Sequence, residues 1–206
     1  MKVLELFCGT KSFSNVAKEN GHEVFTIDND PQFNPDLCKD ILDLKDIPFD
    51  IPFRPDVIWA SPPCQCFSVA TIGKNWNKED KSPKNDRARQ AIELVMKTLE
   101  IIEILKPKFW FIENPRGMLR KMSFMIPLPR KTVTYCQYGD TRMKPTDIWT
   151  NLNWKPKEMC NYGDTCHVSA PRGSPTGTQG IKGSRDRGII PKELCLEIIK
   201  CLELFQ

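Results

Sequence analysis

The chain has 206 residues, 40% of them hydrophobic and 27% charged, which is typical of one globular domain large enough to bury a core and excludes wholesale disorder. It has no apolar run of the roughly 18 residues that a membrane span needs, and its net charge of +4 permits a polyanionic partner without requiring one. Nine cysteines, an odd number in a chain without an export signal, argue against a disulfide framework and favour reduced thiols in a cytoplasm.

The first sixty residues carry the pattern of a βαβ unit followed by a third strand. The apolar run 3–7 predicts a strand that ends in a polar, glycine-containing turn. A helix over about 12–20 and an alternating strand over 23–27 follow. After proline-rich connections, residues 57–60 predict the third strand. The order strand, helix, strand within about 30 residues is typical of a parallel sheet.

The second half begins with a long helix and a fourth strand. Apolar residues recur at helical spacing over 89–105, and an aromatic run at 109–112 follows the proline that ends this helix. The charged stretch 75–89 has almost no aliphatic residues and is interpreted as a mobile loop. The weaker candidates are two strands and a closing helix, at 133–135, 147–150 and 191–204.

Polar residues stand where the predicted strands end, at Cys8, Asp28, Ser61 and Glu113. In an open parallel α/β sheet, the carboxyl ends of the strands line the ligand crevice. The turn at 7–12, Phe-Cys-Gly-Thr-Lys-Ser, fits neither G-x-G-x-x-G nor a phosphate-binding Gly-Lys-Ser/Thr ending. The sequence therefore predicts a doubly wound, mostly parallel sheet that binds a cofactor without phosphate.

The segment 61–68, Ser-Pro-Pro-Cys-Gln-Cys-Phe-Ser, holds Cys64 behind a stiff diproline at a strand end. Metal binding, a disulfide and nucleophilic catalysis are the three alternatives for such a cysteine. Cys64 and Cys66 are too close in sequence for the common zinc spacings, and we interpret Cys66 as an inert filler.

Five segments resemble, in order over about 190 residues, the motifs of the C5-cytosine DNA methyltransferase family, particularly its short phage-like members. The first ends in Phe-x-Gly, the second matches Pro-Cys-Gln-x-Phe-Ser, and the third matches Glu-Asn-Val with Pro in place of Val. The last two resemble Tyr-Gly…Arg-x-Arg, in a shortened setting, and Arg-x-Leu-Thr-x-x-Glu. The five segments are 4–9, 61–68, 113–115, 137–144 and 187–193.

The resemblance implies a Rossmann-like, S-adenosylmethionine-dependent methyltransferase. It implies a catalytic domain at 1–150, a short variable target-recognition segment at 151–186, and a C-terminal helix at 187–206 that returns to the catalytic domain. Two departures concern recognition. The variable region is much shorter than is usual in the family, and the C-terminus has no good match to the last, cofactor-facing motif.

For catalysis, the resemblance implies that the Cys64 thiolate adds to C6 of cytosine, which makes C5 nucleophilic enough to take a methyl group. Glu113 would protonate or hydrogen-bond N3, and Asn114 would fix the loop geometry. Arg142 and Lys144 would hold the base carbonyl or a phosphate, although both could also be solvated surface residues. Gln65 and Ser68 would contribute to substrate binding.

For the cofactor, the resemblance implies S-adenosylmethionine. Phe7 would pack on the adenine, Gly9 would admit the methionine end, and Asp28 would accept from the ribose hydroxyls. Pro63 would complete the cofactor site. Asp40 would contact the adenine amine, though a helix cap is nearly as good an interpretation.

A group of possible zinc ligands lies in and near the variable segment: Cys136, Cys160, Cys166 and His167. Structural metal ions do stabilise short loop-rich segments in other proteins. The spacings match no standard zinc pattern, so the sequence assigns no metal ligands and leaves open whether these four residues bind zinc.

The predicted function is therefore C5 methylation of cytosine in DNA, in a cytoplasm and in a phage or restriction-modification setting. Basic residues over 74–89 would track the phosphate backbone, or would simply form a solvated surface. The alternatives are the same chemistry on single-stranded DNA, RNA or a cytidine nucleotide, and a catalytically silent nucleic-acid-binding homologue that needs a partner.

Overall fold

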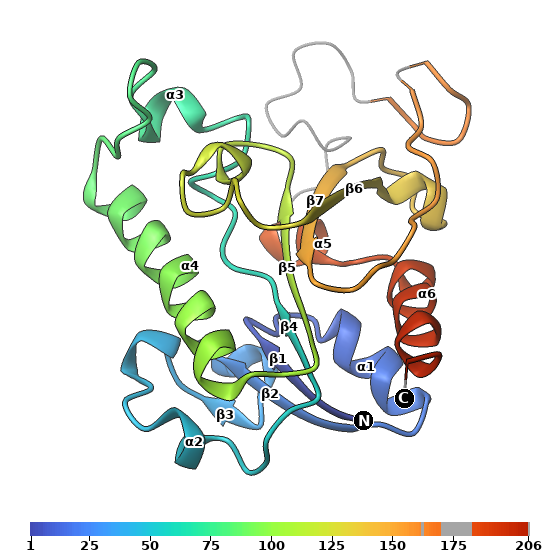
Figure 1. Cartoon of the computed structure of the whole chain (residues 1–206). Helices are drawn as coiled ribbons and strands as arrows, with labels where there is room; N and C mark the ends of the chain where they lie inside the picture. The colour runs from blue at the N-terminus through green and yellow to red at the C-terminus, as the bar shows by residue number, and fades with distance from the viewer. Residues whose placement is uncertain (162, 170–182, 206) are drawn as a thin grey trace.

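The computed structural model describes residues 1–161, 163–169 and 183–205, arranged around a seven-stranded sheet (Figure 1). The strand order is β3-β2-β1-β4-β5-β7-β6. The first five of these strands pair in parallel, whereas β7 runs antiparallel to both of its neighbours. The strands are β1 (Lys2–Leu6), β2 (Glu23–Asp28), β3 (Leu37–Cys38), β4 (Val57–Ala60), β5 (Phe109–Pro115), β6 (Arg130–Thr134) and β7 (Pro145–Thr150).

Helices cover both faces of the sheet. Helices α1 (Ser12–Glu19) and α6 (Lys192–Glu203) pack together on one face, and α4 (Asp86–Leu105) covers the other (Figure 1). None of the helices in the described part of the chain is long and apolar enough to cross a membrane. The short elements are α2 (Ile47–Asp50), α3 (Ile72–Asn75), α5 (Ser184–Gly188) and the 3-10 helices η1 (Pro31–Phe33), η2 (Ile41–Asp43), η3 (Leu119–Lys121) and η4 (Tyr135–Tyr138).

Strand β4 is fully buried, and its side chains alternate between the two helical layers. Val57 and Trp59 face the layer of α1 and α6, whereas Ile58 and Ala60 face the layer of α4. The Trp59 ring stacks on Phe13 at 4.5 Å between ring centroids and on Phe111 at 5.5 Å. A strand buried on both faces is typical of a parallel sheet between helices.

The chain reverses its direction of strand addition at β1. It first builds outward through β2 and β3, and then returns to place β4 and β5 on the other side of β1. Such a switch point opens a crevice at the carboxyl ends of the strands. The predicted doubly wound, mostly parallel sheet is therefore confirmed. The ligand crevice is expected at the carboxyl ends of β1 and β4, on either side of the switch point.

The interpretation of 75–89 as a mobile loop is wrong in part. Helix α4 already begins at Asp86, with the Asn85 side chain accepting a hydrogen bond from the Ala88 N–H at 2.9 Å. Trp76 is buried, stacks on Phe67 at 5.4 Å and donates to the Cys66 carbonyl at 2.7 Å. A helix cap and one aromatic anchor order this stretch, so it needs few aliphatic residues.

Candidate active site

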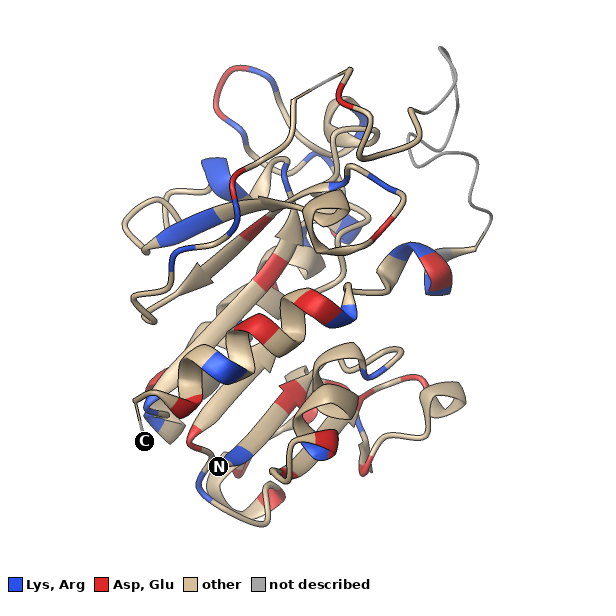
Figure 2. Cartoon of the chain, turned by 90° about the vertical axis from the view of Figure 1, so that its right-hand side faces the viewer, with Lys and Arg blue, Asp and Glu red and all other residues tan. Residues whose placement is uncertain are grey.

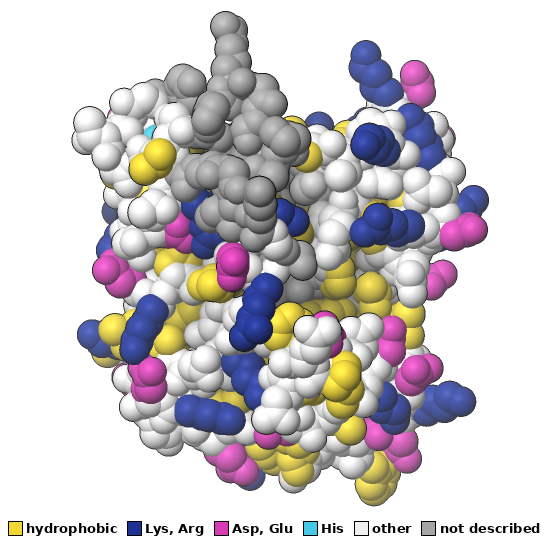
Figure 3. Space-filling view, turned by 180° about the vertical axis from the view of Figure 1, so that it is seen from behind, with side chains coloured by type: hydrophobic (Ala, Val, Ile, Leu, Met, Phe, Trp, Pro, Cys, Tyr) yellow, Lys and Arg dark blue, Asp and Glu magenta, His cyan; other side chains and the backbone are white. Residues whose placement is uncertain are grey.

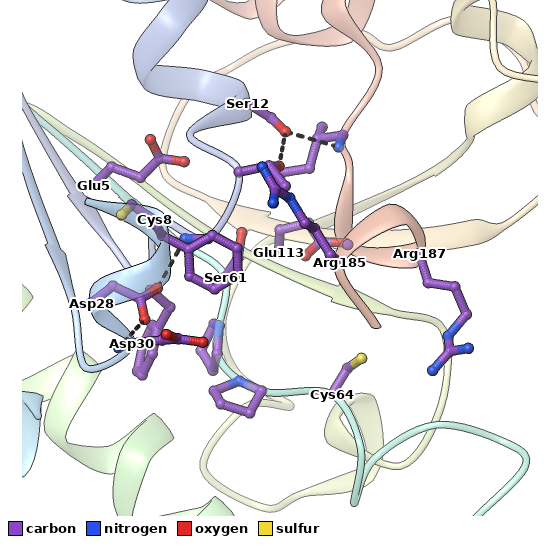
Figure 4. A pocket seen from close by; sticks show the side chains of 18 of the residues that line it. Glu5, Cys8, Ser12, Asp28, Asp30, Ser61, Cys64, Glu113, Arg185 and Arg187 are labelled. Atoms are coloured by element: carbon purple, nitrogen blue, oxygen red, sulfur yellow. Dashed lines mark hydrogen bonds between the residues drawn. The ribbon is translucent and has the colours of Figure 1, made fainter. Parts of the chain in front are cut away.

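A cavity of about 380 Å³ lies at the carboxyl ends of β1, β2, β4 and β5. Figure 4 shows Asp28 and Asp30 on one side of it and Cys64 and Arg187 on the other. The cavity has the size of a small-molecule site. Its lining includes these residues that the sequence singled out: Phe7, Gly9, Asp28, Pro63, Cys64, Gln65, Glu113 and Lys144.

The turn after β1 forms one wall through an unusual backbone. Phe7 has a φ of 56° and Gly9 a φ of 45°, in the left-handed region that a bulky side chain rarely adopts. The Gly9 N–H donates to one Asp28 carboxylate oxygen at 2.9 Å, and the Asp30 N–H donates to the other at 2.9 Å. The ends of β1 and β2 are thus tied together, with the Phe7 ring and the Asp28 carboxylate at the cavity wall.

The loop that carries Cys64 is held from β5 and from the segment after it. The Asn114 side chain donates to the Pro62 carbonyl at 2.9 Å, and the Met118 N–H donates to the Phe67 carbonyl at 2.7 Å. A Cβ on Gly117 would lie 2.2 Å from the Phe67 carbonyl oxygen, so this close approach requires glycine. Asn114 therefore holds in place the loop that carries Cys64, although Asn114 itself does not line the cavity.

The surroundings of Cys64 favour the neutral thiol over the thiolate. Burial raises its pKa above the ordinary value, and the nearby Glu113 carboxyl raises it further. The positive charges of Lys144 and Arg187 lower the pKa of Cys64, but this effect is smaller than the combined effect of burial and Glu113. Because the thiolate is the nucleophile, Cys64 must lose its proton before it can react.

We expect alkylation of Cys64 by iodoacetamide to accelerate with pH up to and beyond pH 9, because a raised pKa moves thiolate formation upward. Lys144→Met should slow the reaction several-fold at pH values below the pKa of the thiol, because it removes a positive charge that favours the thiolate. Mass spectrometry of the Cys64 peptide would measure both. Lys155→Met, on an exposed residue, is the control. A rate that levels off below pH 8 would contradict this assignment.

Glu113 lies on β5 and is 6% exposed. The Tyr135 hydroxyl donates to its Oε1 at 3.0 Å. Burial raises the pKa of Glu113, and Lys144 opposes this effect. A carboxyl group that remains protonated at higher pH than usual is suited to donate a proton to a ring nitrogen.

Glu5 is a site residue that the sequence did not single out. It is 2% exposed in the middle of β1, lines the cavity, and accepts a hydrogen bond from the Ser14 N–H at 2.9 Å. Burial raises its pKa to about 7. The available signal was an acid within an otherwise apolar strand. Other lining residues that the sequence did not single out are Ser12, Asp30, Phe33, Arg185 and Ile190.

We expect Glu5 to destabilise the fold progressively as the pH rises from about 4.5 to about 7. In this window the unfolded chain loses the proton while the folded protein keeps it, so stability falls with pH. Glu5→Gln should therefore gain about 2 to 3 kcal/mol relative to the wild type across the window. Chemical denaturation at several pH values would measure this difference, with exposed Glu23→Gln as control. A difference that is independent of pH would contradict it.

Asp40, Ser68 and Arg142 do not line the cavity. The Asp40 side chain caps η2 by accepting from the Leu42 N–H at 2.9 Å, which matches the alternative interpretation as a helix cap. The Ser68 hydroxyl contacts the Thr71 hydroxyl at 3.2 Å. Both side chains are thus used within local turns.

The expected contact of Arg142 with the base or a phosphate requires correction. Its guanidinium is buried, pairs with the Asp140 carboxylate and donates to the backbone carbonyls of Asp186, Arg187 and Ile189. These bonds engage every nitrogen of the guanidinium, so few donors remain for a ligand. Arg142 instead positions the segment that carries Arg187. Lys144 donates to the Arg187 carbonyl at 2.9 Å from within the cavity lining.

The first 124 residues match the model of the C-5 cytosine-specific DNA methylase family. A curated protein of Frog virus 3 (isolate Goorha), described as a DNA (cytosine-5)-methyltransferase, is 31% identical over 222 residues, which cover 97% of this chain and 99% of the viral protein. The chain therefore belongs to the C-5 cytosine-specific DNA methylase family. The family and the class of function predicted from the five motifs are confirmed.

One solved structure shares the fold. A crystal structure described as a DNA modification methyltransferase encoded within an E. coli prophage has a TM-score of 0.54 and 18% identity, over 82% of this chain. The present chain covers 57% of that one. A triple mutant of Spodoptera frugiperda DNMT2 has a TM-score of 0.49 and 19% identity, over 78% of this chain and 53% of its own. The first of these structures supports the methyltransferase-like architecture.

Proposed function

We propose that the protein transfers a methyl group from S-adenosylmethionine to C5 of cytosine in DNA, with Cys64 as the nucleophile and Glu113 as the acid. The observation that carries this proposal is one cavity, at the switch point of the sheet, that holds a half-buried thiol and a buried carboxyl group. The two groups are close enough for the Glu113 charge to raise the pKa of Cys64.

Three features of the cavity lining support S-adenosylmethionine as the cofactor. Two aromatic side chains, Phe7 and Phe33, line it and can flank the adenine ring, and the Asp28 carboxylate can accept from ribose hydroxyls. Glu5 is a buried carboxyl without an opposite charge in a hydrogen bond with it, which suits a ligand with cationic groups. The cofactor supplies the methyl group as part of a positively charged sulfonium.

Cys64 and Glu113 have complementary tasks in the reaction. The Cys64 thiolate adds to C6, while protonated Glu113 donates to N3, so that the ring becomes an enamine whose C5 can accept the methyl group. The demethylated cofactor is left as a neutral thioether. Loss of the C5 proton to a base, elimination of the Cys64 sulfur as a thiolate and return of the N3 proton to Glu113 then restore the aromatic ring. Lys144 stabilises the thiolate, and Asn114 holds the loop through Pro62.

DNA is the favoured substrate because a basic stretch lies beside the nucleophile loop. Trp76 fixes this stretch to the Cys66 carbonyl, and the Cys66 thiol contacts the Arg87 carbonyl at 3.5 Å. A base inside a duplex must leave the stack to reach Cys64. Lys and Arg are interspersed with Asp and Glu over much of one face (Figure 3), so the charge is local rather than a continuous patch. The basic residues are Lys74, Lys78, Lys81, Lys84, Arg87 and Arg89.

The test is transfer of a labelled methyl group from S-adenosylmethionine. Duplex DNA, single-stranded DNA, RNA and deoxycytidine monophosphate would be offered in parallel. We expect label in duplex DNA, at C5 of cytosine. Label in another pool alone would keep the chemistry but overturn the substrate, and cofactor binding without label in any pool would favour a silent homologue.

A further inference from the structure

Four soft metal ligands from separate parts of the sequence meet outside the cavity. The Sγ atoms of Cys136, Cys160 and Cys166 and a ring nitrogen of His167 all lie within 4.8 Å of one another. Cys136 and Cys160 are buried, His167 is half-buried and Cys166 is exposed. Three thiols and one imidazole are a ligand set that structural zinc sites use.

The separations between these atoms match a tetrahedral centre. Zinc bonds of about 2.3 Å to sulfur and about 2.0 to 2.1 Å to nitrogen place two sulfurs about 3.8 Å apart, and a sulfur and a nitrogen about 3.6 Å apart. The Cys136 and Cys166 sulfurs are 3.6 Å apart. The His167 Nδ1 lies 3.7 Å from the Cys160 sulfur and 3.6 Å from the Cys166 sulfur. The Cys136 and Cys160 sulfurs are closer, at 3.1 Å.

Helix η4 and several hydrogen bonds hold the four ligands in this position. Cys136 lies in η4, directly after β6. The Cys160 N–H donates to the Thr134 hydroxyl of β6 at 3.0 Å, and the Val168 N–H donates to the Thr141 carbonyl at 2.9 Å, so Cys160 and Val168 are each held to the part of the chain around η4. The Gln137 side chain donates to the Cys166 sulfur at 3.6 Å and can orient that ligand from outside the cluster.

We propose that Cys136, Cys160, Cys166 and His167 form a structural Zn²⁺ site. All four positions are filled by protein ligands, which is typical of a structural site and leaves no open position for catalysis. The ion clamps the beginning of the variable segment to η4, next to Tyr135, whose hydroxyl contacts Glu113. This proposal answers a question that the spacing of the four residues along the chain had left open.

A zinc ion would explain how the short variable segment is held in place. Residues 151–161 and 163–169 form no strand or helix, so no regular backbone hydrogen-bond ladder of their own holds them in place. A loop-rich segment of this kind is stabilised by a metal ion in many small domains. The alternative at the same sulfurs is a disulfide between Cys136 and Cys160.

The test is the zinc content of the full chain, purified under reducing conditions after growth with added Zn²⁺ and measured by inductively coupled plasma mass spectrometry. We expect one zinc per chain. Cys166→Ser, at an exposed ligand that the fold can spare, should lose most of the zinc, and a strong chelator should lower the wild-type melting temperature. Cobalt in place of zinc should give the thiolate charge-transfer absorption of a tetrahedral site.

Cys38→Ser is the matched control, because Cys38 is exposed and lies outside the cluster. It should keep the full zinc content. The proposal is overturned if the wild type contains far less than one zinc per chain, or if Cys166→Ser binds as much as the wild type. A Cys136–Cys160 cross-link in the unreduced protein, seen as a loss of two hydrogens in the intact mass, would overturn it as well. None of these results depends on methyl transfer, so the zinc site can fail while the proposed function holds.

Discussion

Cys64→Ala is expected to abolish methyl transfer to cytosine, with a loss of at least about 10⁴-fold, because the covalent route through C6 disappears. The variant should still bind S-adenosylmethionine with little change, since most of the proposed cofactor contacts come from the turns that follow β1 and β2. Labelled methyl transfer and isothermal titration calorimetry would measure the two quantities separately.

Cys66→Ala is the matched control for this loss. It removes a thiol from the same loop, but the Cys66 sulfur is buried and contacts the Arg87 carbonyl rather than the cavity. Its activity should stay near that of the wild type. Substantial turnover by Cys64→Ala, or a loss of the same size in both variants, would contradict the assignment of the nucleophile.

Glu113→Gln is expected to reduce kcat by about 10² to 10⁴-fold, the usual contribution of a general acid. The amide keeps the shape of the side chain and can accept from Tyr135, but it cannot give a proton to N3. Single-turnover methyl transfer at saturating DNA and cofactor would measure the step itself.

Exposed Glu103→Gln on α4 is the control for this change. If Glu113→Gln raised KM but left kcat unchanged, Glu113 would only bind substrate. A loss that followed unfolding would be visible as a lowered melting temperature, and a Glu113→Asp variant would then separate the loss of the acid from the loss of packing.

The sequence was sufficient for the parts of the site that follow directly from strand ends. Cys64, Asp28 and Glu113 each stand where a predicted parallel strand stops, and the topology of the sheet brings such ends together. The mostly parallel fold followed from the same reasoning. The antiparallel placement of β7 between β5 and β6 did not, because neither strand has a strong alternating pattern.

The residues that sequence reasoning missed depend on long-range partners. Arg142 pairs with Asp140 and with backbone carbonyls more than forty residues later, and no periodicity reports such bonds. Glu5 stands out in the sequence as an acid within an apolar strand, but only its burial at the cavity shows that it belongs to the site. Figure 2 shows that α5, at the end of the grey trace, carries both basic and acidic residues, so composition alone does not identify Arg185 and Arg187 as cavity residues.

The metal ligands illustrate the same limit. Zinc motifs are recognised by regular spacing along the chain, but Cys136 is separated from Cys160 by the whole of β7. Only the return of the chain from β7 to η4 brings the four ligand atoms together. The spacing of the four residues along the chain therefore did not indicate a zinc site, whereas their types, three cysteines and one histidine, did.

The most direct test of the account is to trap the adduct between Cys64 and cytosine. A duplex oligonucleotide that contains 5-fluorocytosine has no C5 proton to lose, so elimination of the sulfur after methylation is blocked. With S-adenosylmethionine present, we expect one covalent complex per chain, with the methylated base attached to the Cys64 sulfur in tandem mass spectra. A complex attached to another residue, or cytosine methylation by the wild type without any trapped complex, would contradict the central claim.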